Sequence, residues 1–174
     1  MGAQSLLTSL YRYKAWADGL LLEAMVDLVQ AGPASNFDTA LRLLNHAHIV
    51  DRIFMAHLQG YSHAYDDNEP DELPPLTDLS ADIRQTDRAY IDYVAGLSAD
   101  DLQVPIRFRF TDGQPGRMSR EEMLAHVITH GGYHRGEIGR LLPEVAPAAS
   151  VDVFAGYLHR SEPERRAWRG DIDC

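Results

Sequence analysis

The chain has 174 residues, of which 45% are hydrophobic and 24% are charged, as in an ordinary globular protein, so we expect one domain over residues 1–174. The formal net charge of −10 argues against a general nucleic-acid binder, because neutralising phosphates requires clustered lysine and arginine. No stretch approaches 18 apolar residues, the first residues show no signal pattern, and Cys174 is the single cysteine, so we expect a cytoplasmic protein without a disulfide or a membrane partner.

Apolar residues recur at helical spacing in the first part of the chain. One helix is expected over residues 5–29, and a second helix begins at a cap on Asn36 or Asp38 and ends before Gly60. The polar stretch over residues 62–75 is rich in acidic residues and proline, which predicts a long crossover loop between helices.

The middle of the chain predicts a third helix and then a change of structure. The third helix starts at Asp78 or Ser80 and ends near Gly96. Residues 104–118 alternate between apolar and polar side chains and then supply turn residues, so we expect a short β-hairpin or extended excursion there.

A capping box marks the start of a fourth long helix. Ser119 is followed three residues later by Glu122, the pattern in which each side chain bonds the other residue's backbone, and the helix runs to about Leu142. A last, extra helix is expected over residues 151–159. The pattern predicts an all-α fold, a four-helix bundle with one long crossover, in which metal sites form between facing helices.

Three histidines, His126, His130 and His134, recur every four residues in the fourth helix. On a helical wheel, His134 lies about 35° from the centre of the apolar face, His130 about 75° and His126 about 115°. His130 and His134 therefore form an inward pair, His126 lies at the rim, and Tyr133 points outward. Imidazoles one helical turn apart can bind the same metal ion, as in other metal-binding helices with this interval.

The second helix carries three more histidines. His46 and His57 flank its apolar face, whereas His48 points away from that face. His46 and His57 are about 16 Å apart along the helix axis, so they cannot share one ion. Either could join the inward pair of the fourth helix, and periodicity alone does not choose between them.

Three segments are distinctive in combination: residues 13–18 (YKAWAD), 44–54 (LNHAHIVDRIF) and 126–138 (HVITHGGYHRGEI). In this order they resemble the DinB family, the damage-inducible, YfiT-like helix bundles that bind metals and are unrelated to the DNA polymerase of the same name. The resemblance covers most of the chain. The HxxxHRG motif together with the upstream Asn-His and Asp-Arg pairs is fairly specific, although each motif alone would be weak.

The resemblance implies an up-down-down-up four-helix bundle, a homodimer, and a divalent metal ion, zinc or nickel, held by three histidines. The ligand motif of the family falls on His46, His130 and His134, which implies a choice of His46 over His57. Many family members have Gln where this chain has Glu137, so the chain carries an additional carboxylate beside the expected site.

Members of the wider superfamily are thiol-dependent S-transferases or isomerases, which implies a divalent-metal-dependent enzyme that uses a low-molecular-weight thiol on a small-molecule substrate. The alternatives are a metal-dependent hydrolase, a non-enzymatic metal-binding stress-response bundle, and a plain bundle with surface histidines. The candidate catalytic residues are Asp51, Arg135 and Glu137. Asp51 could instead have a purely structural role, in a salt bridge to Arg135 or Arg52.

Overall fold

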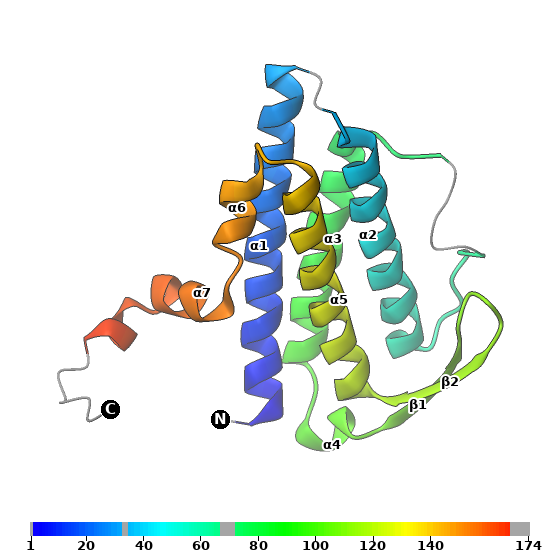
Figure 1. Cartoon of the computed structure of the whole chain (residues 1–174). Coiled ribbons are helices and arrows are strands. Elements are labelled where there is room, and N and C mark those ends of the chain that lie inside the picture. Colours follow the sequence, from blue (N-terminus) through cyan, green and yellow to red (C-terminus); the bar gives the residue numbers. More distant parts are fainter. Residues whose placement is uncertain (1, 33–34, 67–71, 168–174) are drawn as a thin grey trace.

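The computed structural model describes residues 2–32, 35–66 and 72–167, and four long helices form a bundle (Figure 1). Followed along the chain, the helices run up, down, down and up, so the predicted all-α bundle and its topology are confirmed. Helix α1 packs mainly against α3, and α2 packs mainly against α5. The four helices are α1 (Ala3–Ala31), α2 (Phe37–Gln59), α3 (Leu76–Ala95) and α5 (Arg120–Leu141).

The helix boundaries follow the local chemistry of the sequence at two predicted positions. The Ser119 hydroxyl accepts a hydrogen bond from the backbone N–H of Glu122, and the Glu122 carboxylate accepts one from the backbone N–H of Ser119, which confirms the capping box. Gly60 ends α2 with a left-handed φ of 76°, a conformation that glycine adopts without steric cost.

One other predicted helix start was wrong, and one predicted cap lacks its hydrogen bond. Helix α3 begins at Leu76, after Pro75 at the N-cap, and not at Asp78 or Ser80, because the fixed φ of proline suits it to the edge of a helix. Asn36 does lie at the N-cap of α2, but its left-handed backbone leaves the side chain without a capping hydrogen bond.

A short connection and a hairpin join α3 to α5. Helix α4 (Ala99–Leu102) precedes strands β1 (Pro105–Arg109) and β2 (Pro115–Ser119), which pair in antiparallel register. This confirms the hairpin predicted within residues 104–118. Gly116 is required in β2, because a Cβ atom there would lie 2.6 Å from the ring of Phe108.

Beyond α5, the chain crosses the outside of the bundle as α6 (Ala146–Ser150), α7 (Phe154–Ser161) and the 3-10 helix η1 (Pro163–Arg166). The extra C-terminal helix predicted over residues 151–159 is confirmed as α7, although it begins three residues later than predicted. Asp152 lies between α6 and α7, where its carboxylate bonds Arg135 of α5 and Tyr13 of α1, so the chain is held there outside a helix. Cys174 lies outside the described residues.

The apolar core consists of two clusters separated by a buried polar layer. On α1, for example, Leu7 and Tyr11 belong to one cluster and Leu21, Leu22 and Met25 to the other, and the buried Lys14 and Asp18 lie between them in sequence. No helix in the described ranges is long and apolar enough to span a membrane. The buried polar residues are Lys14, Asp18, Asn45, His48, Asp51, Asp87, His134 and Arg135.

Candidate metal centre

Three histidines meet where α2 faces α5. His46 comes from α2, and His130 and His134 come from successive turns of α5. One ring nitrogen of each lies within 4.8 Å of the other two, and the Nε2 atoms of His130 and His134 are 3.1 Å apart. The three side chains therefore lie close enough to bind one metal ion, which is the arrangement expected from the resemblance.

The surroundings of His130 favour a neutral imidazole. Burial, and then the neighbouring His134, His126 and His46, lower the pKa of His130 to about 3. A histidine with this pKa is uncharged at pH 7, and neutral imidazole is the form that binds zinc, nickel, copper or iron. The separation of the two Nε2 atoms is also near the roughly 3.4 Å between two nitrogens bound to one tetrahedral zinc ion. The donor set fits a divalent metal.

Glu137 contacts the cluster from outside. Its Oε2 atom is 2.8 Å from Nδ1 of His134, one turn back along α5. A carboxylate on the second nitrogen of a ligating histidine fixes the tautomer and the ring orientation, so that Nε2 is left as the ligand atom. Glu137 is therefore placed to orient His134.

The remaining predicted histidines lie outside the cluster. His126 lies one turn before His130 and stacks on Phe54, with ring centroids 4.6 Å apart. His57 packs against His63, with ring centroids 5.0 Å apart. Tyr133 is 64% exposed, as predicted.

His48 was predicted to point away from the apolar face of the second helix, yet it is buried. Its side chain is only 5% exposed, because α3 packs against α2 beside the face that α5 covers. His48 lines a cavity of about 20 Å³ together with Asp51, Lys14 and His134. This volume holds a single water molecule. The polar layer and the histidine cluster are thus adjacent.

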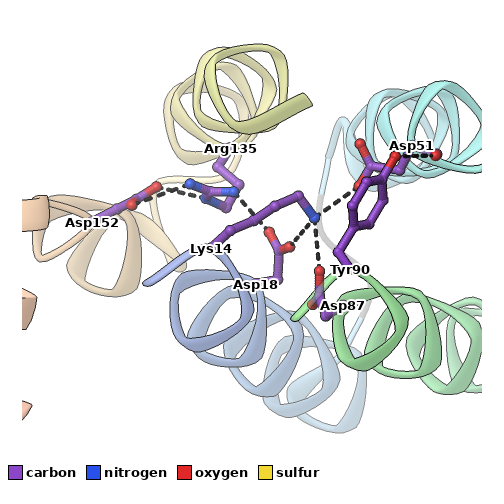
Figure 2. Close-up of polar contacts among 7 residues, drawn as sticks. All are labelled: Lys14, Asp18, Asp51, Asp87, Tyr90, Arg135 and Asp152. Atoms are coloured by element: carbon purple, nitrogen blue, oxygen red, sulfur yellow. Dashed lines mark hydrogen bonds and ion pairs between the residues drawn. The ribbon is translucent and has the colours of Figure 1, made fainter. Parts of the chain in front are cut away.

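Lys14 is the centre of the buried polar layer (Figure 2). Its Nζ atom is 2.8 Å from a carboxylate oxygen of each of three residues: Asp18, Asp51 and Asp87. The predicted alternative for Asp51, a salt bridge to Arg135 or Arg52, was therefore wrong in its partner, because Lys14 of α1 reaches Asp51 across the core.

Arg135 continues the same network toward the outside of the bundle (Figure 2). It donates to Asp18 at 2.9 Å and to Asp152 at 2.7 Å, so its guanidinium joins α1, α5 and the segment after α6. Arg135, a candidate catalytic residue, is held in buried ion pairs. Asp51, the other buried candidate, pairs with Lys14 through Oδ2, whereas its buried Oδ1 has no hydrogen-bond partner in the described part of the chain.

Sequence reasoning missed the importance of Lys14, although a signal was present. Fifteen of the sixteen cationic residues of the chain are arginines, and Lys14 is the one lysine. Its side chain is 2% exposed. Burial alone lowers its pKa, but the three carboxylates outweigh burial, so the pKa lies well above the usual value and the ammonium stays charged.

The carboxylates of the network differ in their affinity for protons. Burial raises the pKa of Asp87 to about 7 and that of Asp51 to about 6, despite the attraction of Lys14. For Asp18, the opposing attraction of Lys14 and Arg135 wins over burial and lowers the pKa. One lysine therefore does not keep all three carboxylates ionised at neutral pH.

The pKa of Asp87 predicts how the substitution Asp87→Asn changes stability with pH. An aspartate with a raised folded-state pKa stabilises the fold fully below its unfolded pKa of about 3.9 and loses this contribution as the pH rises through about 7. Relative to wild type, the variant should gain about 2 kcal/mol in unfolding free energy between pH 5 and pH 8. Denaturant titrations of the metal-free proteins at each pH measure this difference. The histidines contribute equally to the unfolding free energy of both proteins, so their titration cancels in the comparison. A difference that stays constant with pH would contradict the assignment.

Comparison with known proteins identifies the family of the chain. The sequence profile described as the DinB family matches residues 1–150. The chain belongs to the DinB family. A similar member is Protein DinB of Bacillus subtilis (strain 168), which is 23% identical over 169 residues, or 90% of this chain and 95% of that protein. No solved structure gives a significant match.

The DinB match includes every residue of the histidine cluster and of the Lys14 contacts. Helix α7 and η1 follow residue 150 and therefore lie outside the part of the chain that the family profile matches.

Proposed function

We propose that this DinB protein is a divalent-metal-dependent enzyme that transfers a low-molecular-weight thiol to a small electrophilic substrate. The observation that carries the proposal is the convergence of His46, His130 and His134 on one point, with Glu137 behind His134. Three histidine ligands leave a coordination position open, which is the arrangement of catalytic rather than structural metal sites. Zinc or nickel is the ion that this proposal assigns to the site, because imidazole nitrogen suits both.

The surroundings of the histidines favour a thiol over water as the nucleophile. A bound divalent metal deprotonates a thiol outright and lowers the pKa of water, but water attack gains further from a separate general base. Of the predicted catalytic residues, Glu137 is paired with His134, and Asp51 is paired with Lys14 through one carboxylate oxygen. Arg135 is a permanent cation and cannot accept a proton. A metal-dependent hydrolase is for this reason the second choice.

The residues of the chain have distinct roles in this proposal. His46, His130 and His134 bind the metal, and Glu137 holds the proton on Nδ1 of His134, so that Nε2 faces the ion. The Lys14 network fixes the spacing of α1, α2 and α3, because its four charged groups sit on those helices and are fully buried. The predicted homodimer, cytoplasmic location and stress-response role stay predictions.

A conjugation assay tests the proposal. Glutathione and cysteine are offered in turn with 1-chloro-2,4-dinitrobenzene; the sulfur forms a bond to the ring carbon, chloride leaves, and the thiol proton passes to solvent. We expect metal-dependent turnover that is lost in His134→Ala and retained in His126→Ala. Turnover that survives removal of the metal would contradict the metalloenzyme. Hydrolysis of an ester without any thiol conjugation would favour the hydrolase.

A further inference from the structure

The β-hairpin presents three arginines on one exposed face. Alternation along the strands directs Phe108 into the core, where its ring contacts Phe54 of α2, and leaves Arg107 and Arg109 exposed. Arg117 of β2 is exposed as well and is the direct cross-strand partner of Arg107. Residues that are paired across two strands lie on the same side of the sheet, so the positive charges are concentrated there.

These arginines lack compensating charges. Within the parts of the chain that the structure describes, none of the three forms an ion pair with a carboxylate; Arg109 donates to the backbone oxygen of Gly113 at 2.9 Å. Like charges directly opposite each other destabilise a hairpin. The arrangement is notable in a chain with 26 acidic and 16 basic residues, where carboxylate partners are abundant. The hairpin thus carries a charge arrangement that is unfavourable without a ligand.

A hollow of about 610 Å³ lies along the hairpin, and residues of both hairpin faces line it. His57 lines the hollow and lies about 16 Å along α2 from His46, at 1.5 Å per residue. The hollow is therefore separate from the histidine cluster. The residues that line it are His57, Arg107, Phe108, Arg109, Pro115, Gly116 and Arg117. The hollow is shallow and open to solvent, and its volume lies in the range of small-molecule sites.

We propose that this hollow binds a small organic anion with at least two negative charges, either a polycarboxylate or a phosphate ester. Guanidinium groups bind carboxylate and phosphate oxygens in a bidentate manner, and three of them on one short hairpin match a multivalent anion. The overall charge of −10 opposes long polyanions such as nucleic acids, which also contact the surface around a site. The site needs no metal ion.

Calorimetric titration of the metal-free full chain with citrate and with pyrophosphate tests the proposal. Sodium chloride at equal ionic strength is the control for screening. We expect saturable binding of one anion per chain, and a loss of more than about tenfold in affinity in the double variant Arg107→Thr, Arg117→Thr. Arg88→Ala, which removes an exposed arginine from α3, should bind as the wild type does. Binding of citrate alone assigns a carboxylate ligand, and binding of pyrophosphate alone assigns a phosphate.

The thermal midpoint of the ligand-free double variant separates binding from folding. Because the substitution removes the Arg107–Arg117 repulsion and threonine suits a strand, the variant should melt at or above the wild-type temperature while binding no anion. Equal stabilisation of wild type and variant by the anions, or a response to sodium chloride of the same size, would overturn the proposal. Tighter binding of a single-stranded oligonucleotide than of pyrophosphate would overturn it too.

Discussion

Replacing His134 by alanine is expected to lower the affinity for zinc and nickel by more than about 100-fold, because the loss of a ligand costs more than the loss of a group that orients it. His134 supplies one of the three converging nitrogens, and its Nδ1 is the atom that contacts Glu137. The substitution therefore removes a ligand and leaves the Glu137 carboxylate without that contact. Isothermal titration of the untagged, metal-free protein with each ion measures the change.

The matched control for this prediction is His126→Ala. His126 lies on the same helix two turns before His134 and stacks on Phe54, outside the cluster. Its removal should leave the affinity for both ions within about twofold of wild type. Equal losses in the two variants would contradict the assignment of His134 as a ligand, as would undiminished binding by His134→Ala.

The substitution Lys14→Met is expected to destabilise the protein by about 4 kcal/mol, because it leaves the carboxylates of Asp18, Asp51 and Asp87 buried without their shared cation. In a chain of this size, such a loss lowers the melting temperature by roughly 8 to 16 °C. Methionine matches lysine in length, so the change removes the charge with little change in packed volume. Thermal and denaturant unfolding at pH 8, where Asp87 is mostly ionised, measure the effect.

Two further variants make this prediction specific to charge. Adding Asp51→Asn and Asp87→Asn to Lys14→Met should restore part of the stability, since amides need no cation. Arg12→Met changes an exposed cation on the same helix and should shift stability by less than about 0.5 kcal/mol. A loss below about 1 kcal/mol for Lys14→Met would show that the network contributes little to the fold.

Much of the fold follows from patterns within single segments. The helical spacing of apolar residues, the Ser119–Glu122 capping box and the alternation before Gly113 are local signals, and the structure follows each of them. The start of α3 and the break at Asp152 were missed. The break depends on contacts with Arg135 and Tyr13, which are distant in sequence.

The candidate site was predictable in part. The helical wheel of α5 places His130 and His134 on the inward side, but the wheel of α2 left His46 and His57 equivalent, and the resemblance to DinB proteins was needed to choose. The burial of His48 was missed because α2 packs against both α5 and α3, so a single apolar face describes it poorly. Lys14 was missed because a lone charged residue in a helix is ordinarily at the surface.

Elemental analysis of the protein purified without a polyhistidine tag tests the central claim most directly, since a tag would contribute imidazoles and metal of its own. If His46, His130 and His134 form a metal centre, the protein should contain about one equivalent of a divalent transition metal per chain, and the His134→Ala variant should contain none. A wild-type protein with no bound metal, whose melting temperature does not change when zinc or nickel is added, would contradict it.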